Sequence, residues 1–143
     1  MNPISLLSWK SLLDPRNALP VCIGLVLVVL LVFGQTLRHG MINIDDPENL
    51  LDPHVKGGIS PPSLLWALSD RRVDRWCPVT KFTRQADHSI HGMRLGGHHA
   101  TNLLLHAATS VLLFLVLRSM SGSHWASAFV AGVFALHPLH VEP

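Results

Sequence analysis

An uncharged run of 21 residues, Asn17 to Leu37, constrains this chain more than any other stretch. As an α-helix rising about 1.5 Å per residue it measures about 32 Å, which matches a hydrocarbon core of about 30 Å. A cleaved signal peptide is the alternative. Its apolar stretch and lead-in are both long for that role, however, and no small-residue cleavage site follows Phe33. We therefore predict a membrane helix over residues 18–37, preceded by a cytoplasmic lead-in at residues 1–17.

Composition supports a lipid environment. Charged residues make up 14% of the chain, against about 25% in soluble domains, and the mean hydropathy is +0.34. The net charge of +2 is small and dispersed, so nucleic acid is not expected as a partner. Cys22 lies in the apolar run and Cys77 in a polar stretch, so we expect no disulfide bond between them.

Residues 38–97 form a 60-residue polar stretch with eight Lys or Arg and seven Asp or Glu. Within it, Ser60 can cap a short helix whose first turn holds two prolines and whose body is Leu64 to Leu68. The apolar and aromatic content of this segment favours a helix lying along the membrane interface. We expect little other regular structure in the stretch.

Two more apolar segments follow. Leu95 to Leu117 contains no Asp, Glu, Lys or Arg, which predicts a second membrane helix over residues 98–117. After a turn at 118–124, residues 125–141 suit a third membrane helix, with an interfacial Trp and small residues for close packing. A soluble helical hairpin is the alternative for both segments. The predicted fold is an all-α membrane protein with three transmembrane helices and a 60-residue outer loop containing a short interfacial helix.

Orientation follows from basic residues in the short flanks. Lys10, Arg16 and Arg118 mark the cytoplasmic side, because long loops cross a membrane largely regardless of charge. The polar stretch at 38–97 then lies outside, and three polar clusters reach the same membrane face. These clusters are Asp45 and Asp46; His98, His99, Asn102 and His106; and His137, His140 and Glu142. Polar residues within membrane helices tend to face a bundle interior or a watery cavity, so we expect a polar pocket there.

The acidic pair Asp45 and Asp46 suits proton transfer. Pro47 biases Asp46 towards extended backbone, so the two carboxylates point in different directions. A carboxylate with restricted water can act as a general base towards a hydroxyl. A turn with two solvated acids is the alternative. Histidine and carboxylate groups also suit zinc or manganese, but the histidines lack a tight ligand spacing. No metal ligand is assigned, and a divalent cation stays an open alternative.

Four runs resemble one family. They are Ile42 to Asp46, Asn49 to Val55, Gly97 to His106 and Ser127 to Glu142. The family is the bacterial, multi-spanning membrane proteins with tetratricopeptide repeats that are similar to protein O-mannosyltransferases, of the lipid-linked-sugar (GT-C) type. The resemblance implies the N-terminal part of a glycosyltransferase in a bacterial inner membrane. Such an enzyme moves a sugar from a polyprenyl-phosphate donor to a hydroxyl acceptor, a protein among the candidates.

The resemblance also implies roles for the polar clusters. Asp45 is the expected acceptor-activating base and Asp46 its partner, while the histidine, asparagine and glutamate residues of the other two clusters are expected to bind substrate. The chain departs from the family in the segment before Gly97. Cys77 stands where the family usually has a His, and Lys81 and Arg84 lie in a segment that is usually apolar. We therefore expect these two charged residues to interrupt a surface that would otherwise contact lipid. With three spans and no repeats, we expect an incomplete enzyme. The alternative is a non-catalytic three-span membrane protein that binds a partner.

Overall fold

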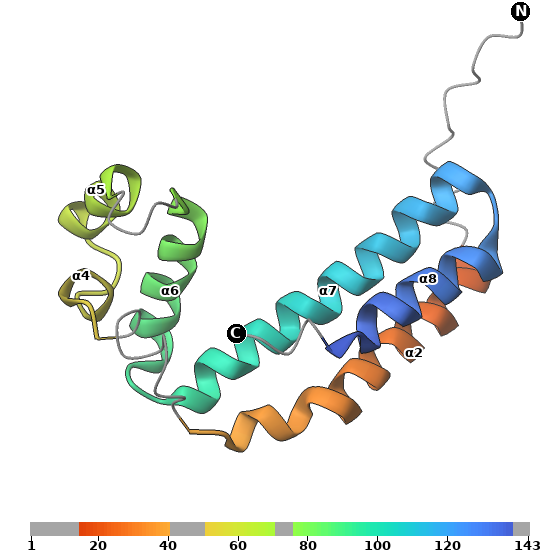
Figure 1. Ribbon diagram of the computed structural model, residues 1–143, viewed down its shortest axis with the longest axis horizontal. Coiled ribbons are helices and arrows are strands. Elements are labelled where there is room, and N and C mark those ends of the chain that lie inside the picture. Colours follow the sequence, from red (N-terminus) through yellow and green to blue (C-terminus); the bar gives the residue numbers. More distant parts are fainter. Residues whose placement is uncertain (1–14, 41–50, 71–75, 139–143) are drawn as a thin grey trace, which may run out of the picture. The chain divides into compact units, whose positions relative to one another are not determined.

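The computed structural model describes residues 15–40, 51–70 and 76–138, and every regular element within these ranges is helical (Figure 1). The described residues form two compact units: residues 15–35 with 102–138 belong to unit 1, and residues 36–40, 51–70 and 76–101 belong to unit 2. The helices, in chain order, are α2 (Pro15–Phe33), the 3-10 helix η1 (Gly34–Arg38), α4 (Pro53–Lys56), α5 (Pro61–Ser69), α6 (Pro78–His91), α7 (Leu95–Ser121) and α8 (His124–Leu136).

Unit 1 packs α2, α8 and the greater part of α7 around one apolar core. Each helix buries residues spaced three, four or seven apart, which places them on one face. The buried residues are Ala18, Leu25, Val29 and Phe33 on α2; Leu103, Ala107, Ser110 and Phe114 on α7; and Ser127, Ala131 and Ala135 on α8. The buried face of α8 consists of small residues, which confirms the close packing predicted for it.

The opposite faces of α2 and α7 are apolar and exposed. Ala18–Arg38 and Leu95–Ser121 are long and apolar enough to cross a membrane, and only 22% of each apolar window is buried. The core helix of a soluble protein is mostly buried instead. The turn predicted at 118–124 is shorter than expected, because α7 continues to Ser121. The next residue, Gly122, ends the helix with a φ of 67°, a left-handed conformation that favours glycine.

Helix α8 is shorter than the third membrane helix predicted for residues 125–141. It ends at Leu136, and its 13 residues span about 20 Å at 1.5 Å per residue, less than a hydrocarbon core of about 30 Å. The last residues of that prediction, 139–141, lie outside the described ranges. A third membrane crossing therefore stays a prediction.

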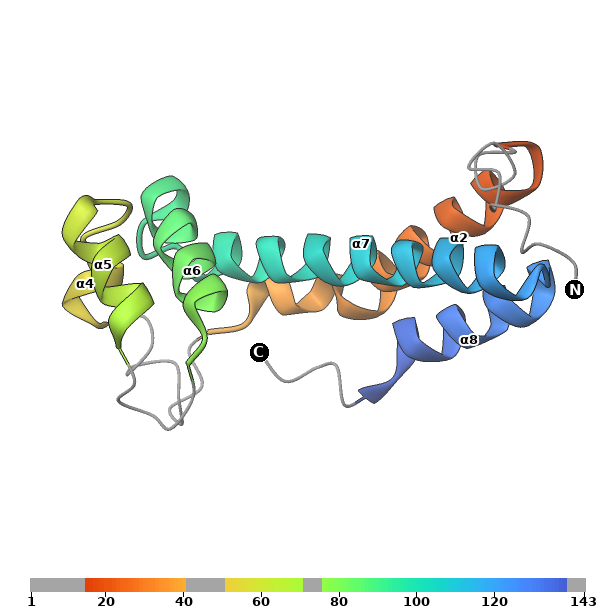
Figure 2. The same ribbon diagram turned by 90° about the horizontal axis from the view of Figure 1, so that it is seen from above.

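Unit 2 holds three short helices, α4, α5 and α6, which contact one another (Figure 2). Helix α5 begins after Ser60, whose side chain accepts a hydrogen bond from the Ser63 amide, while the position of this helix along the membrane interface stays a prediction. Helix α4 starts in the same way, since the Asp52 carboxylate accepts from the His54 amide at 2.8 Å. The expectation of little further regular structure was wrong, because α6 alone spans 14 residues.

Candidate functional site

His98 closes the end of helix α6. That helix ends at His91, and the next residue, Gly92, has a φ of 59° that turns the chain away. The Gly92 carbonyl accepts a hydrogen bond from His98 Nε2 at 3.0 Å. A carbonyl oxygen can only accept, so Nε2 must carry the proton. The buried His98 side chain thus satisfies one of the carbonyls that a helix end leaves without an intrahelical partner.

Asp87 lies beside this histidine and was not singled out from the sequence. Its carboxylate is buried, accepts a hydrogen bond from Thr101 Oγ1 at 2.7 Å, and lies 3.8 Å from His98 Nδ1. A buried carboxylate requires such partners, because an unpaired charge away from water is costly. Asp87, His98 and Thr101 therefore tie the second half of α6 to the first turns of α7.

Two glycines allow this junction to close. A Cβ atom on Gly97 would lie 2.3 Å from Cγ of the His91 ring, and one on Gly96 would lie 2.9 Å from the Leu37 carbonyl oxygen. Real Cβ atoms do not approach so closely, so both positions need glycine unless neighbours move. Gly96 and Gly97 at the start of α7 are therefore needed for packing, and they directly precede His98, the first residue of the predicted substrate-binding cluster.

His106 donates a hydrogen bond to a backbone carbonyl at the end of α8, as His98 does at the end of α6. Its Nε2 lies 3.0 Å from the carbonyl oxygen of Ala135, one residue before α8 ends, and must donate to it. The imidazole also meets the rings of Phe33 and Phe134, with centroids 5.5 and 5.7 Å away. His106 therefore links α7 to both other helices of unit 1. Its hydrogen-bond acceptor, Ala135, lies two residues before the predicted site residue His137.

The other described members of the predicted clusters have different environments. Asn102 and His137 are exposed, and His137 immediately follows α8. The Nε2 atom of His99 is buried without a hydrogen-bond partner.

Four predicted site residues, Asp45, Asp46, His140 and Glu142, lie outside the described residues. The convergence of the three clusters at one membrane face also involves both units, so it stays a prediction.

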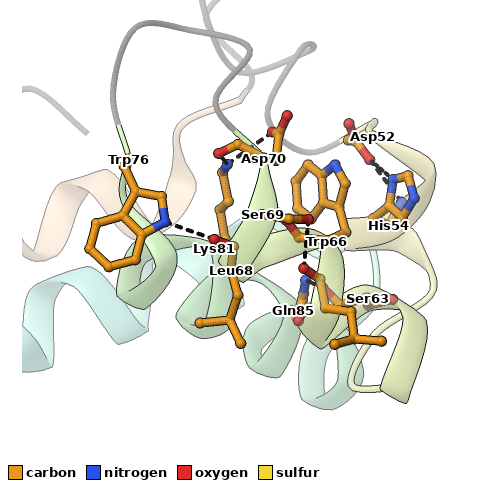
Figure 3. Close-up of polar contacts among 11 residues, drawn as sticks. Asp52, His54, Ser63, Trp66, Leu68, Ser69, Asp70, Trp76, Lys81 and Gln85 are labelled. Carbon is orange, nitrogen blue, oxygen red and sulfur yellow. Dashed lines mark hydrogen bonds and ion pairs between the residues drawn. The ribbon is translucent and has the colours of Figure 1, made fainter.

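A second polar cluster lies between α5 and α6 (Figure 3). Lys81 Nζ contacts the Asp70 carboxylate and the Asp70 carbonyl, each at 2.9 Å, and sits 4.8 Å from the centre of the Trp66 ring. His54 stacks on Trp66 at 4.8 Å with an interplanar angle of 3°. Figure 3 shows Trp66 between these two groups. The expectation that Lys81 interrupts a lipid-facing surface was wrong, because only 15% of its side chain is exposed.

No metal centre emerges from the described ranges. Within residues 15–40, 51–70 and 76–138, no three His, Cys, Asp or Glu side chains are grouped as metal ligands. The histidine nitrogens with defined contacts face the carbonyls of Gly92 and Ala135 or the carboxylates of Asp52 and Asp87.

The fold defines an all-helical protein with two helices able to cross a membrane and a helical insertion between them. The chain is similar to two Drosophila melanogaster proteins, Protein O-mannosyl-transferase Tmtc1, with 31% identity over 126 residues, and Protein O-mannosyl-transferase Tmtc2, with 30% identity over 129 residues. These matches cover 83% and 85% of this chain but 15% and 14% of the relatives' length. No protein-family model and no solved structure matches the chain significantly.

Proposed function

We propose that this chain is the acceptor-activating part of a membrane glycosyltransferase, which moves a sugar from a polyprenyl-phosphate donor to a hydroxyl on a protein. The observation that carries the proposal is similarity over more than four-fifths of the chain to two proteins named as protein O-mannosyl-transferases. The exposed apolar faces of α2 and α7 support a membrane location. Both relatives are animal proteins, so a bacterial inner membrane and the GT-C class rest on the sequence resemblance alone.

In the proposed mechanism the Asp45 carboxylate takes the proton of the acceptor hydroxyl as the hydroxyl oxygen attacks the anomeric carbon of the sugar. The bond from that carbon to the phosphate oxygen breaks, and the polyprenyl phosphate leaves with the bonding electrons. A base within hydrogen-bond reach contributes about 10²- to 10⁴-fold to such a step. Asp46 positions the acceptor beside it.

The histidine clusters divide into two roles under this proposal. Asn102 and His137 are exposed and can reach a substrate directly, whereas His99, whose Nε2 atom is buried, lies one residue after His98 at the start of α7. His98 and His106 hold the ends of α6 and α8, so their contribution is to position the helices that carry the others. His140 and Glu142 complete the substrate-binding set.

The proposed membrane arrangement places the N-terminus in the cytoplasm and residues 38–97 on the outer side. Lys10, Arg16 and Arg118 support that orientation, because basic residues in short flanks stay inside. A third crossing by residues 125–141 belongs to the same proposal.

The test is a transfer assay in proteoliposomes on a full-length relative that carries this chain in place of its matching segment, with polyprenyl-phosphate mannose and a Ser/Thr peptide. We expect Asp45→Asn to reduce transfer by about 10²-fold or more, since the base is lost. Glu48→Gln is the matched control, because it removes a carboxylate from the same segment without touching the pair, and it should transfer normally. Equal turnover by Asp45→Asn and the unaltered chain would overturn the assignment of the base.

A non-catalytic membrane protein is the second candidate. The exposed apolar faces of α2 and α7 fit such a protein equally well. This candidate predicts no transfer by the relative that carries the unaltered chain, although the chain inserts into the membrane.

A further inference from the structure

The turn between α7 and α8 encloses polar atoms that no protein group satisfies. Helix α7 ends at Ser121 and α8 begins at His124, so the turn is short (Figure 1). Arg118 lies in the last turn of α7, and its Nη1 atom is buried with no hydrogen-bond partner. The same holds for Nδ1 of His124. Such atoms are uncommon, because a polar group taken out of water without a partner is costly.

The ring of Phe114 is the common neighbour of these two side chains. Phe114 is fully buried and lies four residues before Arg118 on α7, and side chains four apart share one face of a helix. The His124 imidazole meets the same ring, with centroids 5.5 Å apart and an interplanar angle of 85°. Arg118 and His124 therefore border one buried ring from two different helices.

Each of the two side chains is enclosed on one side and open on the other. Both residues are half-buried, and no hydrogen bond or ion pair joins either side chain to the described part of the chain. Their remaining nitrogens are not buried. A neutral His124 avoids a buried, unpaired N–H group when its proton is on Nε2. Guanidinium and imidazole N–H groups are therefore directed outward from partly enclosed side chains.

The described part of unit 1 provides no counter-charge for Arg118. Residues 15–35 and 102–138 contain no Asp or Glu. A guanidinium group stays charged in proteins. A cation that is partly removed from water attracts an anion more strongly than a fully hydrated one does, because the effective dielectric constant around it is lower. An anion from outside these residues would therefore be bound at the open edge of Arg118.

The position of Arg118 along its helix indicates where that anion comes from. The apolar helix Leu95–Ser121 has 27 residues, about 40 Å at about 1.5 Å per residue. This length exceeds a hydrocarbon core of about 30 Å and approaches the thickness of a bilayer with its headgroups. When this helix crosses a bilayer, its last turn lies among the headgroup phosphates. Arginine binds phosphate oxygens through strong, often paired, hydrogen bonds.

We propose that Arg118 and His124 bind the phosphodiester group of a phospholipid at the turn between α7 and α8. The outward N–H groups of Arg118 donate to phosphate oxygens, and His124 Nε2 donates to a further oxygen. The lipid supplies the negative charge that the described part of unit 1 lacks. Because the contact is with the phosphate itself, zwitterionic and anionic phospholipids both fit, whereas a glycolipid without phosphate does not. The inference does not depend on sugar transfer.

The experiment is thermal unfolding of the full chain in dodecyl maltoside, which carries neither phosphate nor charge, followed by far-UV circular dichroism. Phosphatidylcholine, phosphatidylglycerol, digalactosyldiacylglycerol or inorganic phosphate is added to separate samples, with the same acyl chains in all three lipids. Arg118→Met keeps a long side chain and removes the charge. Arg38→Met is the matched control, because Arg38 is exposed at the end of the other helix able to cross a membrane.

We expect both phospholipids to raise the unfolding midpoint by about 4 °C or more over the galactolipid, in the unaltered chain and in Arg38→Met. Arg118→Met should lose this difference. His124→Phe, which keeps a ring beside Phe114 but donates nothing, should keep part of it. Without added lipid, Arg118→Met should unfold at least as high as the unaltered chain, because it removes a partly enclosed charge that has no partner.

Four results would overturn the proposal. Equal midpoints with phosphatidylcholine and the galactolipid would show that the phosphate is not recognised. A full phospholipid response by Arg118→Met would place the contact elsewhere. A response to phosphatidylglycerol alone, or an equal response to inorganic phosphate, would show attraction of bulk negative charge or a site for a free anion. A less stable or unfolded Arg118→Met without lipid would show that Arg118 is held by the protein itself.

Discussion

Replacing His106 by alanine removes two kinds of contact at once, and their sizes can be worked out separately. The hydrogen bond to the Ala135 carbonyl joins two apolar helices, where such bonds contribute about 0.6 kcal/mol on average and up to about 1.7. The ring contacts with Phe33 and Phe134 contribute about 0.5–1.5 kcal/mol each. We therefore expect His106→Ala to lower the free energy of unfolding of unit 1 by about 2–4 kcal/mol.

His106→Phe separates the two contributions. A phenyl ring can keep both ring contacts but donates nothing to the carbonyl, so its cost should be about 1–2 kcal/mol. The control is Leu104→Ala on the same helix, since Leu104 is 65% exposed and its truncation should change stability by less than about 0.5 kcal/mol.

The assay is unfolding in dodecyl maltoside micelles titrated with SDS, followed by energy transfer between dyes on α7 and α8. We expect the loss in free energy of unfolding to increase in the order Leu104→Ala, His106→Phe, His106→Ala. If His106→Ala matched Leu104→Ala to within about 0.5 kcal/mol, the role of His106 in holding α8 would be refuted.

Substitutions at Gly97 and Lys81 test the contacts within unit 2. Gly97→Ala should destabilise the chain by about 1–3 kcal/mol, because the new methyl group meets the His91 ring. Gly132→Ala, where nothing lies within 4 Å, should stabilise it by about 0.5–1 kcal/mol in the same unfolding assay, and a reversed order would contradict the packing role. Lys81→Met should cost about 1.5–3 kcal/mol by removing the charged contact between Lys81 Nζ and the mostly buried Asp70 carboxylate. Adding Asp70→Leu should recover part of that loss, and strictly additive costs would show that the pair is not coupled.

Features set by local chemistry could be predicted from the sequence. The uncharged runs beginning at Asn17 and Leu95 correspond to the two long helices, because length and apolarity alone decide that feature. Ser60 caps α5 as expected, since capping needs only neighbouring residues. The buried Ala131 and Ala135 likewise follow from the small-residue pattern of α8.

Features that depend on distant partners could not be predicted. Helix α6 was missed because its polar residues face its neighbours, so the usual signal of an inward apolar stripe is absent. A repeat of polar residues at Lys81, Gln85 and His88 was the available signal. His98 and His106 read as site residues from their spacing, whereas their partners, Gly92 and Ala135, are 6 and 29 residues away.

A chimera tests whether this segment activates an acceptor for sugar transfer. The segment of Drosophila Protein O-mannosyl-transferase Tmtc1 that matches this chain is replaced by the chain's own residues, and mannose transfer to a protein acceptor is measured in membranes. We expect the chimera to transfer mannose, to lose transfer on Asp45→Asn and to keep it on Glu48→Gln. A chimera that inserts normally yet transfers no sugar, or one that transfers equally well with Asp45→Asn, would contradict it.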